Sequence, residues 1–187
     1  MLAALCVAIE ARDPSMQGHS ARVADLAVEL GRRLNWTRNR LGIVRLGGLL
    51  HDVGKLAVSE RVLTKPGPLE PAELAAVRVH PVAGAKLLKP ISAARPALGC
   101  VLFHHERWDG CGYPMGRAGD EIPVEARALA VTDAFDAMTT ARPYRRALHP
   151  TEALAEITRC AGTQFDPALA SSFVGLWTDE LPAAAAS

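Results

Sequence analysis

The hydrophobic residues of this chain mostly recur three or four positions apart. Between His19 and Leu34 the apolar positions are 23, 26, 27, 30 and 34, which is the spacing of a helix with one buried face. Thr37 is a suitable N-cap for a following helix that we expect to end near Asp52. We find no stretch in which apolar and polar residues alternate, as they do in a half-buried strand. The pattern therefore predicts an all-α protein.

Segments rich in proline and glycine separate the other predicted helices. Residues 64–71 (TKPGPLEP) cannot form a regular helix, and residues 107–123 are best interpreted as a long loop. We find no internal repeat and no linker, so residues 1–178 are predicted to form one domain and residues 179–187 a frayed tail. The remaining helices are expected at residues 1–12, 71–79, 81–88, 95–105, 124–140, 151–160 and 167–177.

Composition and charge narrow the class of protein. Apolar residues make up 49% of the chain, which argues against disorder. The net charge is +1 without a basic stripe, so binding to duplex nucleic acid is not expected. The 4 cysteines are scattered, which favours reduced thiols and a cytoplasmic protein over a disulfide framework or a zinc ribbon. No apolar run reaches the length of a membrane span.

The histidines stand in unusual places. Each alone is more often an ordinary core or surface residue, and His149, which precedes Pro150, is expected to be a surface or capping residue rather than a ligand. The others lie at predicted helix ends or beside loops, and together with Asp133 they form the mixed imidazole and carboxylate set that a metal site requires. They are His19, His51 (followed by Asp52), His80 (followed by Pro81), and His104 and His105 (followed by Glu106).

Two further patterns suggest where a phosphate group is bound. In HDVGK, a helix would place Lys55 on the same face as His51 and Asp52, where the ammonium can contact a phosphate held by a metal. The alternative is a lysine that interacts with the negative end of a helix. Asp133 and Asp136 share one face of an otherwise apolar helix, and buried carboxylates need a partner such as a metal.

The chain resembles the HD-GYP family, a branch of the HD-domain metal-dependent phosphohydrolases, from about residue 8 to residue 176. Because many motifs occur in order, the resemblance is specific. The motifs are AIEARDP and GHSARV (within residues 8–23), LLHDVGKL (49–56), KPGPL (65–69), HPVAGA (80–85), HHERWDGCGYP (104–114), DAFDAMTTARPYR (133–145) and GTQFDP (162–167).

The resemblance implies an HD-domain helical bundle with a Gly-Tyr-Pro loop between helices, and hydrolysis of cyclic di-GMP to pGpG and GMP. Two divalent metal ions, iron or manganese, would share Asp52 and a bridging water that becomes the attacking hydroxide, with Asp52 and Lys55 as catalytic residues. The implied metal ligands are His19, His51, Asp52, His80, His104, His105 and Asp133. The implied substrate-binding residues are Lys55, Gly112, Tyr113, Asp136, Arg142 and Arg145.

One departure from the family pattern concerns the number of metals. Some members carry a glutamate four residues before the first histidine, where it helps to hold a third metal. This chain has Ser15 there, so we expect two metals. The resemblance also implies a regulatory or diguanylate cyclase domain as a partner of the Gly-Tyr-Pro loop. For the isolated domain we expect a monomer or a weak dimer.

Other functions fit part of the pattern. Another HD-domain nucleotide phosphohydrolase would keep His51 and Asp52 but would not need the Gly-Tyr-Pro loop. A cyclic di-GMP sensor without activity is the second alternative, although such members usually lose ligands. A purely structural helical domain would leave the histidine pattern unexplained.

Overall fold

The computed structural model describes residues 5, 8–9, 11–12, 16–141 and 146–178 of the chain. This part is helical and contains no strand, as the sequence predicts. No helix in it is long and apolar enough to cross a bilayer. The α-helices are α2 (His19–Arg33), α3 (Arg38–Leu50), α4 (Glu60–Leu63), α5 (Pro71–Arg78), α6 (His80–Leu88), α7 (Leu98–Phe103), α8 (Val124–Thr139), α9 (Pro150–Arg159) and α10 (Pro167–Thr178). Short 3-10 helices are η2 (Val53–Ala57), η3 (Ser92–Ala97) and η4 (Gly119–Glu121).

Several helix starts confirm the expected capping. The hydroxyl oxygen of Thr37 accepts a hydrogen bond from the backbone N–H of Arg40 at 3.3 Å at the start of α3. Pro71 begins α5, where its missing N–H costs nothing. His149 is exposed and caps α9 through its ring nitrogen. The local sequence is therefore sufficient to place these helix starts.

Two predicted helices are shorter in the structure. The helix after Thr37 ends at Leu50, so His51 and Asp52 lie in a turn before η2, and the helical face proposed for HDVGK was wrong. The helix predicted at residues 95–105 is split into η3 and α7, because Pro96 cannot donate a backbone hydrogen bond. As a result, the histidines of both segments lie just beyond the end of an α-helix.

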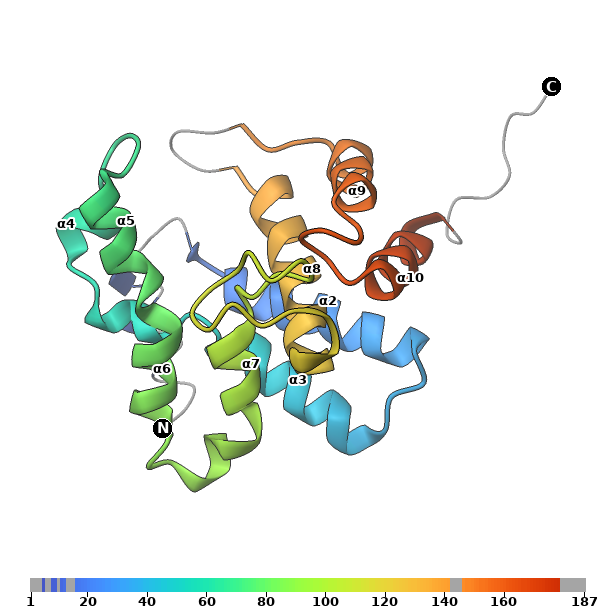
Figure 1. The fold of residues 1–187 in the computed structure, drawn as a ribbon, viewed down its shortest axis with the longest axis horizontal. Helices are drawn as coiled ribbons and strands as arrows, with labels where there is room; N and C mark the ends of the chain where they lie inside the picture. Colours follow the sequence, from blue (N-terminus) through green and yellow to red (C-terminus); the bar gives the residue numbers. More distant parts are fainter. Residues whose placement is uncertain (1–4, 6–7, 10, 13–15, 142–145, 179–187) are drawn as a thin grey trace.

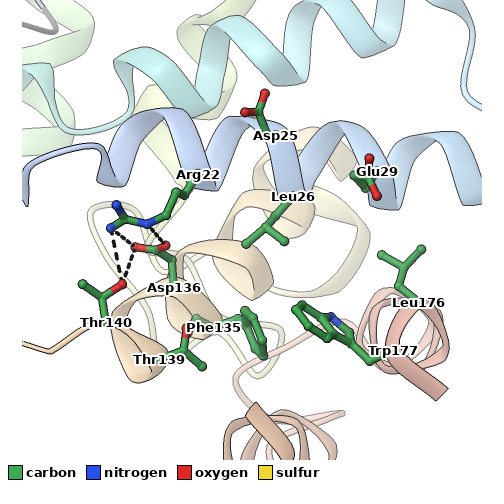
Figure 2. Close-up of a pocket in the computed structure, with 10 residues that line it drawn as sticks. All are labelled: Arg22, Asp25, Leu26, Glu29, Phe135, Asp136, Thr139, Thr140, Leu176 and Trp177. Carbon is green, nitrogen blue, oxygen red and sulfur yellow. Dashed lines mark hydrogen bonds and ion pairs between the residues drawn. The ribbon is translucent and has the colours of Figure 1, made fainter. Parts of the chain in front are cut away.

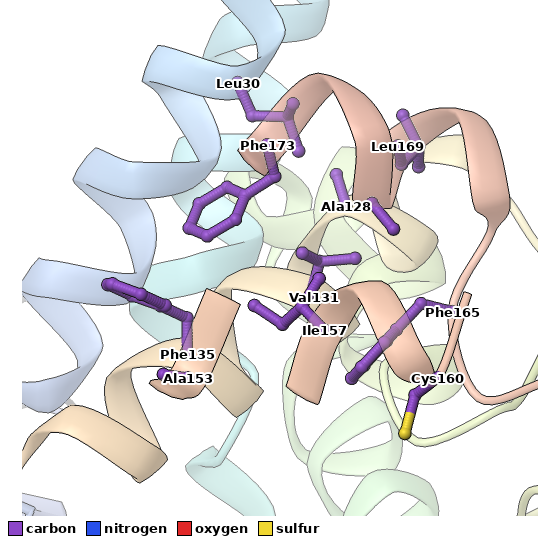
Figure 3. Packing of buried hydrophobic residues seen from close by; sticks show 11 residues of the cluster. Leu30, Ala128, Val131, Phe135, Ala153, Ile157, Cys160, Phe165, Leu169 and Phe173 are labelled. Carbon is purple, nitrogen blue, oxygen red and sulfur yellow. The ribbon is translucent and has the colours of Figure 1, made fainter. Parts of the chain in front are cut away.

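The helices α2, α3 and α8 form the centre of the molecule, with α4–α6 on one side and α9 and α10 on the other (Figure 1). The chain between α7 and α8 is a long loop that crosses in front of α8 in this view. Figure 3 shows the core between α2, α8, α9 and α10, in which side chains from all four helices interdigitate. Its largest members are Leu30, Phe135, Ile157, Phe165, Leu169 and Phe173.

A close backbone contact joins η2 to α6. A Cβ atom at Gly54 would lie 1.8 Å from the carbonyl oxygen of His80 and 2.5 Å from the backbone nitrogen of Gly84. Only glycine fits here, because backbone atoms cannot move aside as a flexible side chain can. The contact brings the turn that holds Asp52 next to the start of α6.

The Gly54→Ala variant is predicted to be destabilised by about 3 kcal/mol or more, because overpacking against the backbone must displace α6. The free energy of unfolding from urea titration measures this. The matched control is Gly42→Ala, since Gly42 is exposed within α3 and has nothing within 4 Å of its added Cβ. That change should stabilise α3 by about 0.5–1 kcal/mol. Equal stability of the two variants would contradict the packing argument.

Candidate metal centre

Four helix ends and the middle of a fifth helix bring the predicted ligands together. His19 begins α2 and His80 begins α6, while the pairs His51–Asp52 and His104–His105 directly follow α3 and α7. Asp133 extends from the middle of α8. The ligand atoms form two groups, each with all its ligand atoms within 4.8 Å of one another. The first group is Asp52, His80, His104 and His105, and the second is His19, His51 and Asp52.

Asp52 belongs to both groups and lies between them. Its Oδ1 is 3.3 Å from Nε2 of His80, and its Oδ2 is 3.3 Å from Nε2 of His51. Asp133 completes the second group, with its Oδ1 at 3.2 Å from Nε2 of His19 and 4.0 Å from Nε2 of His51. One carboxylate can therefore contact cations in both groups, which is the usual arrangement of a two-metal site.

Backbone carbonyl groups orient three of the imidazoles in the same way. The Nδ1 atoms of His51, His80 and His104 lie 2.8, 2.8 and 3.0 Å from the carbonyl oxygens of the residues three positions earlier. A ring that donates its Nδ1–H in this way has its Nε2 lone pair free for a metal. Accordingly the Nε2 atoms of His80 and His104 face each other at 3.2 Å.

Two buried polar atoms test whether the donors fit a metal. Nε2 of His51 and Oδ1 of Asp52 make no hydrogen bond among the described residues, although both residues are almost fully buried. Leaving such atoms without a partner costs about 1–3 kcal/mol each. A divalent cation would satisfy both, and imidazole with carboxylate is a donor set that iron, manganese and zinc accept. The residues therefore fit a metal centre.

The two groups differ in the charge of their histidines. Burial lowers the pKa of His80 to about 4 and that of His104 well below its usual value, so both rings are neutral at pH 7. Against the effect of burial, Asp133 and Asp136 raise the pKa of His19 to about 9. Against the same effect, Lys55 and His51 keep the pKa of Asp52 well below its usual value. The carboxylates are thus ionised, and a cation must compete with the proton on His19.

Asp136 lies behind His19. Its Oδ2 is 2.6 Å from Nδ1 of His19, and Nε of Arg22 donates to its Oδ1 at 2.5 Å. Figure 2 shows Arg22 and Thr140 bonded to this carboxylate at one end of a cavity of about 530 Å³ between α2, α8 and α10. Asp136 therefore orients a metal ligand in this structure, and the substrate contact that we expected for it stays a prediction.

Lys55 also contacts the centre through a carboxylate. Its Nζ donates to Oδ2 of Asp52 at 2.7 Å, and the side chain is 18% exposed. The 3-10 helix η2, rather than the expected α-helix, provides this contact. A positive charge thus lies at the edge of the candidate metal site, where a phosphate group can reach it.

The loop after α7 forms one wall of the site. The buried carboxylate of Glu106 accepts hydrogen bonds from the backbone N–H groups of Met115 and Arg117 at 2.7 and 3.1 Å. A Cβ atom at Gly112 would lie 2.5 Å from Cα of Glu106, so the loop needs glycine there. The ring of Tyr113 stacks on His105 with 4.8 Å between centroids. The peptide bond between Tyr113 and Pro114 is cis.

A pocket of about 270 Å³ opens beside the metal ligands. Its lining includes His104, His105 and Asp133, the loop residues around Tyr113, and residues of α5, α8 and the loop between α9 and α10. Four residues at or next to the candidate site had no role predicted from the sequence: Arg22, which binds Asp136, and Arg78, Glu106 and Gln164, which line this pocket. Of these four residues, only Glu106 could have been noticed from the sequence, because it follows two histidines. The predicted contacts of Arg142 and Arg145, and the consequence of Ser15, lie outside the described residues.

Comparison with known proteins agrees with this geometry. The model of the family described as "HD domain" matches residues 4–169. The chain belongs to the HD-domain family. The Gly-Tyr-Pro motif and the relatives place it in the HD-GYP branch.

The relatives are phosphodiesterases by name. The chain is 39% identical to the cyclic di-GMP phosphodiesterase response regulator RpfG of Xanthomonas campestris pv. campestris, covering 89% of this chain and 44% of the relative. It is 38% identical to the 3'3'-cGAMP-specific phosphodiesterase 3 of Vibrio cholerae, covering 85% and 35%. Among solved structures, the HDG"Y"P protein Bd1817 of Bdellovibrio bacteriovorus aligns with a TM-score of 0.69 at 20% identity, covering 86% and 51%, which supports the fold. The chain spans less than half the length of these two curated relatives.

The Asp136→Asn variant is predicted to bind metal about 10- to 100-fold more weakly, because an amide holds the ring of His19 less firmly than a carboxylate does. Titration of the metal-free protein with Mn²⁺ measures the affinity, and circular dichroism checks the fold. Asp25→Asn is the matched control, since this exposed carboxylate on α2 pairs with Arg45. Unchanged affinity in Asp136→Asn would show that Asp136 does not orient His19.

Proposed function

We propose that this chain is the catalytic domain of a metal-dependent phosphodiesterase that hydrolyses cyclic di-GMP to pGpG, GMP or both. The observation that carries the proposal is the pair of buried donor groups that share Asp52 beside an open pocket. The relatives named as cyclic di-GMP phosphodiesterases support the choice of substrate.

The seven predicted ligands are the residues that would hold two metals. His80, His104 and His105 would bind one cation, His19, His51 and Asp133 the other, and Asp52 both. Bound divalent iron or manganese supplies positive charge and a water molecule of lowered pKa beside the scissile phosphate. A third metal is not expected, because Ser15 replaces a glutamate.

The chain's own residues bind and orient the substrate. Lys55 is fixed by Asp52, so its ammonium offsets the negative charge that develops on the phosphate oxygens. Gly112 and Tyr113 line the pocket next to His105 and limit the access of bulk water. Arg142 and Arg145 provide two more guanidinium groups for the dinucleotide in the family pattern.

The alternatives fit fewer of the observations. A sensor without activity has no need for a complete ligand set, and here all seven positions carry a metal-binding side chain. A phosphohydrolase for single nucleotides has no need for a loop held by Glu106 beside the pocket. A diguanylate cyclase or regulatory domain as partner of the loop, the cytoplasmic location and the monomer or weak dimer stay predictions.

Purification without oxygen, metal analysis and an assay with cyclic di-GMP test the proposal. We expect about two metals per chain, and pGpG or GMP as products. Full metal loading with binding of cyclic di-GMP but no product would favour the sensor. A protein that takes up no metal would overturn the assignment of the site.

The Asp52→Ala variant is predicted to lose turnover, because it removes a carboxylate that both donor groups share. Product formation and metal content should fall together, while Asp25→Ala, which changes an exposed carboxylate on α2, should keep both. An active Asp52→Ala protein with its full metal content would contradict a mechanism in which Asp52 is a ligand of both metals.

A further inference from the structure

The pocket beside the metal ligands contains a guanidinium group with no established role. Arg78 is the last residue of α5, and its Cζ lies 5.4 Å from the ring centroid of Tyr113. It is exposed and lines the pocket, and it has no carboxylate partner in the described part of the chain. The ring thus holds the guanidinium at the pocket wall through a cation–π contact and leaves its N–H donors free.

A second polar side chain, which comes from a segment distant in the sequence, lines the same pocket. Gln164 lies in the loop between α9 and α10, and its backbone oxygen accepts a hydrogen bond from the N–H of Trp108 at 3.2 Å. This bond ties the loop to the segment that follows His105. Its side-chain amide is half-buried, and no hydrogen bond to it is found among the described residues. The amide is therefore free to contact a ligand.

The other charged groups of the pocket wall are already engaged. Arg107 makes two hydrogen bonds to the carboxylate of Asp109, at 3.0 and 2.6 Å. Glu106 accepts hydrogen bonds from two backbone N–H groups of the loop. Asp133 faces His19 and His51 in the candidate metal centre. Arg78 and Gln164 are thus polar side chains of this wall that remain available for a ligand.

We propose that Arg78, with Gln164, forms a subsite that recognises a guanine base of the substrate. This proposal rests on the proposed function and adds the origin of its base selectivity. Guanine presents two adjacent acceptors, O6 and N7, which match the planar fork of an arginine. Adenine replaces O6 by an amino group, which is a donor and cannot pair with a guanidinium. An amide carries both donors and an acceptor, so Gln164 can contact either purine and Arg78 makes the choice.

The position of the subsite separates base recognition from phosphate binding. The phosphate is expected beside Asp52 and Lys55, which lie among the metal ligands. Arg78 contacts Tyr113, whose ring covers His105 at the loop side of the pocket. A cyclic dinucleotide with its phosphate at the ligands can therefore place one base against the loop.

The test compares kcat/KM for cyclic di-GMP, 3'3'-cGAMP and cyclic di-AMP in the metal-loaded wild type, Arg78→Met, Arg78→Lys and Gln164→Leu. Arg78→Met should lose about 10- to 100-fold on cyclic di-GMP and leave the weaker turnover of cyclic di-AMP unchanged, because one bidentate base contact is removed. Arg78→Lys should also lose selectivity, since an ammonium lacks the fork. Gln164→Leu should lower kcat/KM for all three substrates to a similar extent. Arg95→Met is the control, because Arg95 is exposed on η3 and does not line the pocket.

Two results would overturn the proposal. An equal loss on all three substrates in Arg78→Met would mean that Arg78 binds phosphate, and no loss on any would mean that it does not contact the substrate. Calorimetric titration with GMP and AMP keeps the test independent of turnover. If the wild type hydrolyses no cyclic dinucleotide, the proposed function fails, whereas tighter binding of GMP than of AMP that disappears in Arg78→Met still supports the guanine subsite.

Discussion

The arrangement of the candidate metal centre depends on the burial of one carboxylate, Asp52. This side chain lies between the histidines at the ends of α2 and α3 and those at the ends of α6 and α7. Removing an ionised carboxylate from water costs several kcal/mol unless opposite charges and donors surround it. Here Lys55 on one side and the imidazoles of His51 and His80 on the other compensate this cost. The contact between η2 and α6 at Gly54 keeps these groups within reach of one another.

Six of the seven candidate ligands stand at helix ends, where a fixed backbone is combined with a free direction for the side chain. The packed apolar core of α2, α8, α9 and α10 holds these helices in place. The residues beyond α3 and α7 then turn toward the centre, and their rings are held by carbonyl oxygens of the last helical turn. The chemistry is thus placed by rigid elements while the centre itself stays polar.

The sequence predicted what depends on neighbouring residues. Helical spacing and capping placed α2, α8 and the starts of α3 and α5, and the resemblance supplied the ligands that the structure brings together. Helix ends were less predictable, because no proline or glycine follows Leu50 before residue 54 although the helix stops at Leu50. Contacts between segments that are distant in the sequence could not be predicted from the spacing of residues along the chain. Arg22 and Asp136 are 114 positions apart, and the contact of Arg78 with Tyr113 joins the end of α5 to the loop after α7.

The side chains of the three consecutive residues His104, His105 and Glu106 contact two different parts of the structure. The two imidazoles belong to the metal donors, and the next side chain holds the backbone of the loop that carries Tyr113. A single short segment therefore connects the metal donors in the interior with the loop at the surface. If binding at the loop moves this segment and changes the affinity for metal, metal binding must change the affinity at the loop by the same factor.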